Sequence, residues 1–87
     1  MVFNIVYKSS VERDLKKLAK PAASRILAQV EEELSKKAAT YPTLKGPFAG
    51  LRKCRIGDYR VICAILGEDA LILRIGHRRE VYKKIVQ

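Results

Sequence analysis

Cysteine, histidine and tryptophan are scarce in this sequence, and their scarcity excludes several kinds of site. The 87 residues include two cysteines, one histidine and no tryptophan. Cys54 and Cys63 do not have the spacing of zinc ligands, and His77 alone could not complete a zinc site with them. Both cysteines lie in apolar, strand-like patterns, so we expect buried thiols of an intracellular protein, with no metal and no cofactor.

Long apolar runs are also missing. The longest apolar run without a charge, residues 61–67, is far too short to cross a bilayer. Residues 1–7 carry neither the basic start nor the cleavage pattern of a secretory signal. We therefore expect a cytoplasmic protein that does not enter a membrane. Because 87 residues suffice for one hydrophobic core, we predict a single domain over residues 1–87.

Acidic residues are half as numerous as basic ones. Nine Asp and Glu face 18 Lys and Arg, which gives a net charge of +9 and a pI near 9.9. The excess is spread over both halves of the chain, so no detachable basic tail carries it. Such a surplus favours polyanionic partners. The alternative interpretation of the positive charge is that it keeps the surface soluble or binds an acidic protein.

The first half of the chain predicts a strand followed by two helices. Residues 1–7 are rich in β-branched and aromatic side chains, and Ser9-Ser10-Val11-Glu12 fits a capping box that opens a helix. Pro21 suits the first turn of the next helix. In that helix apolar residues recur at spacings of four up to about residue 39: Ala22, Ile26, Val30, Leu34 and Ala38. The charged residues of the first helix are expected to face solvent: Glu12, Arg13, Asp14, Lys16 and Lys17.

The second half predicts three short strands after a loop over residues 40–50. The strands are expected at residues 51–56, 60–66 and 70–75, separated by turns at Gly57-Asp58 and Gly67-Glu68-Asp69. Gly76 would end the last strand, and residues 81–86 would form a short helix or an extended tail. The predicted fold class is α+β, in the order β-α-α-β-β-β, with a mainly antiparallel sheet packed against an αα-hairpin.

The turn at Gly57-Asp58 would gather cations on one sheet face. With a two-residue loop, Arg55 lies opposite Arg60, and alternation places Lys53 beside them. Like charges directly opposite each other destabilise a sheet by up to about 1 kcal/mol, so this clustering favours an anion-binding site. Ordinary surface cations are the alternative. The opposite face would be apolar and cover the helices, with Cys54, Ile56, Tyr59, Val61, Cys63 and Ile65.

A second cluster of polar side chains follows the last predicted strand. Gly76-His77-Arg78-Arg79-Glu80-Val81-Tyr82 places one His, two Arg, one Glu and one Tyr within seven residues. Strand ends and loops often carry catalytic or binding side chains. The alternative is a purely structural role, in which His77 is a turn residue, Arg78 and Arg79 are solvated, and the Tyr82 ring packs on the core.

Three segments resemble successive signatures of the RelE/ParE toxin superfamily. They are Leu44-Lys45-Gly46, Gly57-Asp58-Tyr59-Arg60-Val61-Ile62 and Gly76-His77-Arg78-Arg79-Glu80-Val81-Tyr82. In this order and spacing they are most similar to the RelE-like mRNA interferase branch. The resemblance implies a toxin of a type II toxin–antitoxin system that cuts mRNA in the ribosomal A site. It implies metal-independent attack of the RNA 2′-hydroxyl on the neighbouring phosphate.

The resemblance also implies site residues and partners. Its catalytic positions fall on Lys53, Arg55, Arg60, Arg78 and Tyr82. Positions implied to bind RNA are His77, Arg79, Arg52 and Tyr59. The implied partners are a cognate antitoxin, the ribosome and mRNA, with operator DNA reached only through the antitoxin.

The chemistry assigns a role to each catalytic candidate. Lys53 is the candidate general base, Arg60 would hold the scissile phosphate, and Arg78 would stabilise the developing charge. Tyr82 would orient or stack the RNA, or share the role of base. Arg55 departs from the lysine that relatives carry on this strand, and arginine does not readily act as a base. Two alternatives are a ParE-like inhibitor of DNA gyrase and a non-catalytic module that binds nucleic acid or antitoxin.

Overall fold

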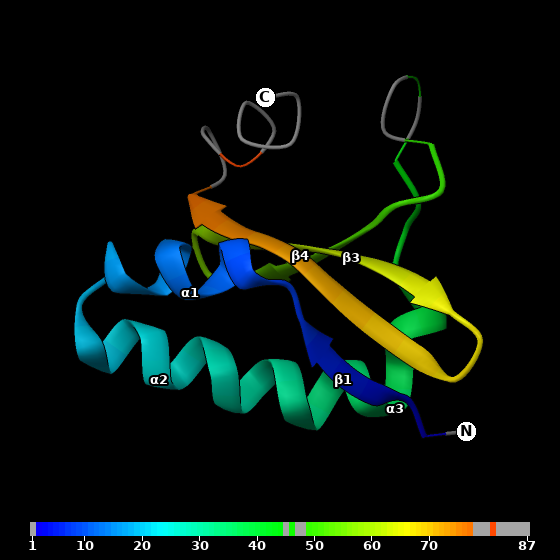
Figure 1. The fold of residues 1–87 in the computed structure, drawn as a ribbon, viewed down its shortest axis with the longest axis horizontal. Coiled ribbons are helices and arrows are strands. Elements are labelled where there is room, and N and C mark those ends of the chain that lie inside the picture. The colour runs from blue at the N-terminus through cyan, green and yellow to red at the C-terminus, as the bar shows by residue number, and fades with distance from the viewer. Residues whose placement is uncertain (1, 45, 47–48, 78–80, 82–87) are drawn as a thin grey trace.

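Four strands form one sheet in the order β1-β4-β3-β2 (Figure 1). This computed structural model describes residues 2–44, 46, 49–77 and 81. The strands are β1 (Asn4–Tyr7), β2 (Arg52–Ile56), β3 (Tyr59–Leu66) and β4 (Asp69–His77). β1 runs parallel to β4, whereas the other two pairings are antiparallel. The predicted mainly antiparallel sheet is therefore confirmed.

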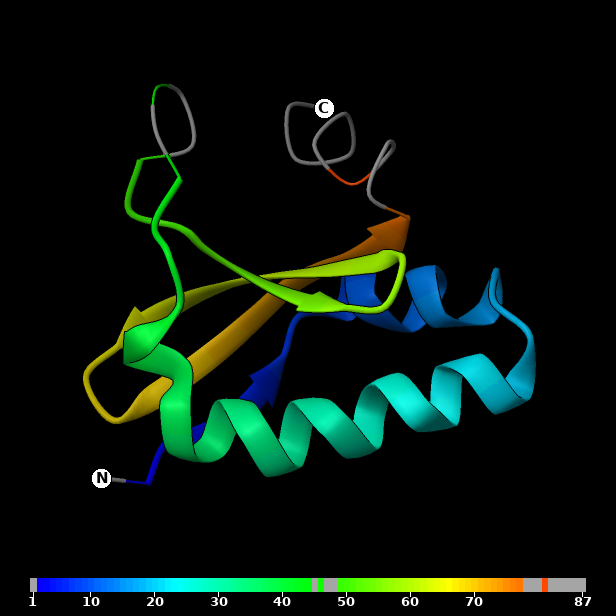
Figure 2. The ribbon, with the colours of Figure 1, turned by 180° about the vertical axis from the view of Figure 1, so that it is seen from behind.

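Helices cover one face of this sheet (Figure 2). α1 spans Ser9–Lys16, and a continuous helical run follows through α2 (Lys20–Gln29), a π turn η1 (Val30–Leu34), α3 (Ser35–Lys37) and a 3₁₀ turn η2 (Ala38–Thr40). Pro21 lies in the first turn of α2, where its missing N–H costs no helical hydrogen bond. The predicted α+β class and αα-hairpin are confirmed.

The π turn explains how apolar residues at a strict spacing of four stay on one side of the helical run. On a straight α-helix with 3.6 residues per turn, such a stripe rotates by roughly 40° at each step. A π turn contains more residues per turn and offsets this rotation. Ile26, Val30, Leu34 and Ala38 are all buried. No helix in the described part of the chain is both long and apolar enough to span a membrane.

The β2–β3 hairpin has the predicted register. Arg55 pairs with Arg60, and Lys53 pairs with Ile62. Gly57 has a φ of 58°, and the structure describes no non-glycine residue with positive φ, so Asp58 does not share it. This combination fits a type II′ turn, which places glycine at the first central position.

The main core lies between the helices and the sheet. Cys54, Ile56, Val61 and Cys63 are buried there, as the alternation along the hairpin predicts, and both thiols are free. From the helices come Val11, Ile26, Val30, Leu34 and Ala38. Ile62 and Val81 are also fully buried but do not belong to this core.

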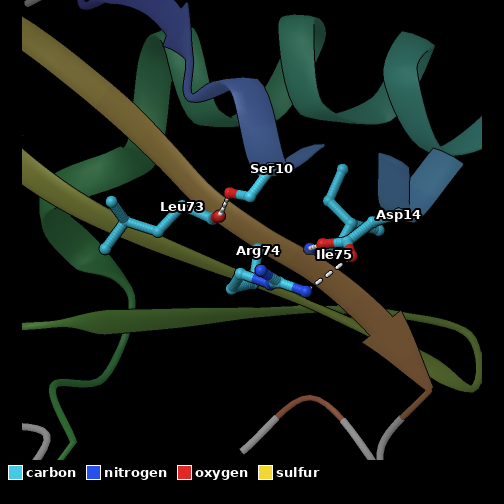
Figure 3. Close-up of polar contacts among 5 residues, drawn as sticks. All are labelled: Ser10, Asp14, Leu73, Arg74 and Ile75. Carbon is cyan, nitrogen blue, oxygen red and sulfur yellow. Dashed lines mark hydrogen bonds and ion pairs between the residues drawn. The ribbon is translucent and has the colours of Figure 1, made fainter. Parts of the chain in front are cut away.

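Helix α1 lies along the part of β4 that β1 does not reach (Figure 3). The Ser10 hydroxyl donates to the carbonyl of Leu73 at 2.8 Å. Asp14 accepts the N–H of Ile75 at 3.0 Å through Oδ2 and the guanidinium of Arg74 at 2.9 Å through Oδ1. These side chains satisfy backbone groups that an open strand edge would leave without partners.

Three local expectations were wrong. Asp14 was expected to face solvent but is 1% exposed, because it binds the β4 edge. The capping box does not form, since Ser9 is already helical and Lys8, in extended conformation, precedes the helix without a side-chain cap. β4 does not end at Gly76 but continues to His77, which pairs with Tyr59.

Candidate functional site

Lys53, Arg55 and Arg60 come together on the sheet face opposite the helices. Arg55 and Arg60 are cross-strand partners, and Lys53 is two residues before Arg55 on the same strand face. All three line a pocket of about 300 Å³, together with Tyr41 and Pro42. The structure therefore brings together the three cations that the hairpin pattern grouped.

This pocket, here called the cation pocket, has no acidic residue in its described lining. Within the part of the chain that the structure describes, the one side-chain ion pair joins Arg74 to Asp14 and involves none of the three cations. Arg60 Nη1 donates to the backbone carbonyls of Gly57 at 3.3 Å and Tyr59 at 3.2 Å. These bonds anchor the guanidinium without neutralising its charge, so the pocket is suited to an anion.

Tyr41 and Pro42 are pocket residues that the sequence reasoning missed. The Tyr41 hydroxyl donates to Oε2 of Glu33 at 3.2 Å, and its backbone carbonyl accepts a hydrogen bond from Arg52 Nη1 at 2.8 Å. Burial raises the pKa of Tyr41 well above its ordinary value, with hydrogen bonding to Cys54 and the charge of Glu33 adding to the effect. Its phenol is therefore neutral near pH 7. The one sequence signal for these two residues is that Tyr41-Pro42 places two ring-bearing side chains at the start of the predicted loop.

Arg52 does not line the cation pocket. It lies on the same strand face as Cys54, whereas Lys53 and Arg55 point to the other face. Its hydrogen bond to the Tyr41 carbonyl ties the segment before the loop to β2. A bridge between Thr43 and Arg52 and a 3.2 Å bond from the Lys53 N–H to the Pro42 carbonyl continue this attachment.

Tyr59 and His77 lie together but away from the cations. Their rings meet edge to face, with centroids 6.2 Å apart and planes at 85°. Alternation places both on the helix side of the sheet, and Tyr59 lines a second pocket of about 310 Å³ between α2 and the hairpin turn. Arg25 and Asp58 also line that pocket. The three described members of the predicted RNA-binding set, Arg52, Tyr59 and His77, thus lie on the helix side of the sheet, whereas Lys53, Arg55 and Arg60 lie on the opposite face.

Arg78, Arg79 and Tyr82 lie outside the described residues. They follow β4, whose Gly76 pairs with Arg60. Their predicted roles therefore rest on the sequence. Among the described residues, no group of three or more His, Cys, Asp or Glu side chains could hold a metal ion.

Comparisons with known proteins identify the family. The family model described as "ParE toxin of type II toxin-antitoxin system, parDE" matches residues 5–82. No curated protein is significantly similar in sequence. The toxin–antitoxin complex RelBE2 from Mycobacterium tuberculosis contains a chain of similar structure, with a TM-score of 0.81 and 24% identity over 90% of this chain and 100% of that one.

Two further structures represent both branches of the superfamily. The chromosomal ParDE system from P. aeruginosa gives a TM-score of 0.71 at 19% identity, covering 87% of this chain and 96% of that one. The intact E. coli RelBE complex gives 0.67 at 12% identity, covering 86% and 95%. At these identities the structures establish the shared fold, and the family model covers most of the chain. The chain belongs to the RelE/ParE superfamily, whose members are toxins of type II toxin–antitoxin systems.

Proposed function

We propose that this toxin is a ribosome-dependent endoribonuclease that cleaves mRNA in the A site, and that the cation pocket binds the scissile phosphate. The observation that carries the proposal is the set of three cations, Lys53, Arg55 and Arg60, around one pocket with no acid in its described lining. Repulsion among such charges is relieved when a phosphate binds between them.

The proposed reaction needs positive charge and two proton transfers. The 2′-oxygen of the ribose attacks the neighbouring phosphorus, and the bond from phosphorus to the 5′-oxygen of the next nucleotide breaks. The products are a 2′,3′-cyclic phosphate and a 5′-hydroxyl, so the attacking hydroxyl loses a proton and the leaving oxygen gains one. Fixed cations stabilise the negative charge that grows on the phosphoryl oxygens.

The residues of the cation pocket divide these tasks. Lys53 is the proposed general base, because arginine at position 55 cannot readily give up its proton. Arg60 is the proposed phosphate ligand, since its guanidinium is anchored at the hairpin and keeps its charge. Tyr41 is no candidate for the base, because burial raises its pKa well above its ordinary value. Arg78 and Tyr82 are proposed to complete the site from the segment after β4.

The remaining RNA-binding candidates receive narrower roles. Arg52 is proposed as a positioning residue, since its guanidinium binds the Tyr41 carbonyl. Tyr59 and His77 would contact RNA only where it passes the end of the sheet, because they lie on the helix side. Arg79 is proposed to contact the RNA backbone.

Partners follow from the charge and the family. A cognate antitoxin is expected, as in the RelBE2 complex that the chain resembles. We propose that an acidic segment of this antitoxin covers the cation pocket and so blocks RNA, consistent with a net charge of +9. The ribosome and mRNA are the proposed targets, and operator DNA would be reached only through the antitoxin.

The second candidate function is inhibition of DNA gyrase by a ParE-like toxin. The observation in its favour is the family model, which carries the ParE description. Such a toxin would stop growth through DNA damage and would leave mRNA intact. The two candidates therefore differ in the nucleic acid that is broken.

Induction of the toxin without its antitoxin tests the proposal. Growth should stop, and primer extension should show new mRNA ends within translated reading frames. The same induction of Arg60→Ala, at equal protein level, should give few or no new ends. Growth arrest with intact transcripts and a DNA-damage response would instead support inhibition of DNA gyrase.

A further inference from the structure

We infer that the pocket between α2 and the hairpin turn, here called the turn pocket, binds a guanine base of the RNA strand whose phosphate lies in the cation pocket. This site depends on the proposed function, since it requires RNA at the hairpin. It gives the toxin a base preference through residues that take no part in proton transfer.

The turn pocket combines buried apolar side chains with exposed polar ones. Ile26 of α2 and Ile56 of β2 line it and belong to the main core, whereas Arg25 and Asp58 line it from exposed positions. Buried side chains form the floor of such a pocket, and exposed ones form its rim. Its volume of about 310 Å³ lies at the lower end of the range for small-ligand sites. The pocket is therefore suited to a compact ligand with an apolar face and polar edges.

The rim of the turn pocket carries both signs of charge, unlike the cation pocket. Arg25 comes from α2 and Asp58 from the hairpin turn, and among the residues that the structure describes they form no ion pair with each other. One cation and one anion together do not favour a phosphate. They complement a neutral ligand that presents acceptors on one edge and donors on another, because arginine only donates and a carboxylate only accepts.

Guanine is the RNA base that matches this rim most completely. Its O6 and N7 accept a pair of hydrogen bonds from an arginine such as Arg25. Its N1–H and its N2 amino group are neighbouring donors, and the two oxygens of Asp58 can accept from both. Adenine offers an acceptor at N7 and a single donor group at N6, and the pyrimidines have no N7. The turn pocket should therefore prefer guanine to adenine, and adenine to either pyrimidine.

The hairpin turn joins the turn pocket to the cation pocket. Arg60 directly follows Tyr59, and strand alternation points their side chains to opposite faces, one into each lining. Arg60 Nη1 also donates to the carbonyls of Gly57 and Tyr59, which anchors the proposed phosphate ligand to the backbone of the turn pocket. Gly57 has no side chain, and a Cβ there would meet no atom within 4 Å. An RNA strand can thus pass over the turn, with a phosphate on one face and a base on the other.

The first test measures base preference without cleavage. GMP and AMP carry the same phosphate, so the ratio of their affinities reports on the base. NMR titration should show tighter binding of GMP, and Asp58→Asn should lower the GMP affinity roughly 5-fold to 150-fold, the cost of losing one paired contact to a base. The affinity for AMP should change less. Glu68→Gln removes an exposed acid from the other hairpin turn and should leave both affinities unchanged.

Arg25→Gln examines the other edge of the base. It should also weaken GMP more than AMP, because the contact to O6 is lost, whereas Arg13→Gln, at an exposed position of α1, should change neither affinity. The amide spectra recorded in the same titrations show whether each variant is folded. Equal affinities of the unsubstituted protein for GMP and AMP would overturn the guanine site. An unchanged GMP affinity in folded Asp58→Asn and Arg25→Gln would do the same.

The second test asks whether the bound base belongs to the cut strand. Ribosomes carry A-site codons that differ only in guanine or adenine beside the scissile phosphate. The unsubstituted protein should cut the guanine codon with the lower KM, and Asp58→Asn should lose this difference. Cleavage without base preference, in a protein that binds GMP, would assign the turn pocket to a free nucleotide and overturn its role in RNA recognition.

A protein that cuts no mRNA would remove the proposed reaction, and a binding experiment then decides the inference. A hexaribonucleotide with one guanosine should displace GMP from the turn pocket, whereas the same strand with adenosine in its place should displace it less. Equal displacement by the two strands would overturn the inference.

Discussion

Arg60 is the residue whose charge is best fixed for binding a phosphate. Two backbone carbonyls of the hairpin accept hydrogen bonds from its Nη1, and it pairs directly with Arg55. A charge that needs no reorganisation during the reaction stabilises the transition state more than a mobile one. Its removal should therefore affect the chemical step.

Arg60→Ala is expected to lower the single-turnover cleavage rate by roughly 10²–10³, the usual cost of losing one such group. The assay uses saturating toxin on ribosomes programmed with one codon in the A site. Lys16→Ala, on an exposed position of α1, is the control and should retain the rate. Equal losses in the two folded variants would contradict the assignment of the cation pocket.

Lys53→Arg separates two proposed roles of Lys53, its positive charge and its acceptance of a proton. The variant keeps a positive charge in the cation pocket but removes the group proposed to accept the proton. We expect the affinity for ribosome-bound mRNA to stay within a few fold while the single-turnover rate falls steeply. A rate equal to that of the unsubstituted protein would show that Lys53 is not the base.

The buried Cys63 thiol predicts a loss of stability at alkaline pH. Burial, together with nearby Cys54, raises the pKa of Cys63 from 9.0 to about 11. Because the folded-state pKa lies above the unfolded one, the stabilisation is complete below about pH 9 and is lost as the pH rises to about 11. Cys63→Ala should remove on the order of 2 kcal/mol of this pH dependence.

Urea unfolding in the presence of a reductant, at pH 8 and pH 10.5, measures the difference. Cys63→Ala will be less stable overall because it leaves a small cavity, but its free energy of unfolding should depend less on pH. Parallel pH profiles for the two proteins would contradict the assignment. Cleavage at neutral pH should not change, since the thiol lies on the sheet face away from the cation pocket.

At the scale of elements, α1 completes the sheet by binding the edge of β4. Asp14 joins the helix to the strand through the Ile75 N–H and the Arg74 guanidinium. β4 also carries the chain from this contact to Gly76, which pairs with Arg60. Contacts of α1 therefore support the strand next to the cation pocket.

Asp14→Ala should lower the free energy of unfolding by about 3 kcal/mol, because it leaves a buried N–H and a partly buried guanidinium without this partner. Glu12→Ala, on the exposed side of the same helix, should change stability by less than about 0.5 kcal/mol. Urea denaturation monitored by circular dichroism gives both values. A cost below about 1 kcal/mol for Asp14→Ala would show that the β4 edge does not depend on this carboxylate.

The sequence predicts those elements whose signals are local. A two-residue turn at Gly57-Asp58 sets the hairpin register, and the period-two pattern then assigns the faces. The burial of Asp14 is not local, since it depends on a strand edge 61 residues further along. Tyr41 escaped notice for the same reason, because Glu33 and Arg52, which fix it, come from two separate elements.

For the whole molecule, a net charge of +9 is expected to contribute to the proposed binding of RNA beyond the cation pocket. Under the proposed function, the exposed helix residues Lys16 and Lys36 would add to a general electrostatic attraction for RNA that salt screens. In this proposal, cations that only attract RNA would affect association, whereas those of the cation pocket would also affect the reaction. Varying the salt concentration separates the contribution to association from the contribution to the reaction, because salt weakens the long-range attraction.

The double variant Lys16→Ala/Lys36→Ala should bind ribosomes more weakly, and the salt dependence of its affinity should be shallower. Its single-turnover rate at saturating concentration should equal that of the unsubstituted protein. Binding is measured by co-sedimentation over a series of potassium chloride concentrations. A reduced rate at saturation would mean that the helix face takes part in the reaction.

The most direct measurement of the central claim is the fate of an end-labelled mRNA on purified ribosomes. We expect the toxin to cut it in the A-site codon, to leave a 2′,3′-cyclic phosphate, and to require Arg60 for the cut. The same preparation should leave gyrase supercoiling activity unchanged. Intact mRNA under saturating toxin, with gyrase inhibited in the parallel reaction, would contradict the account.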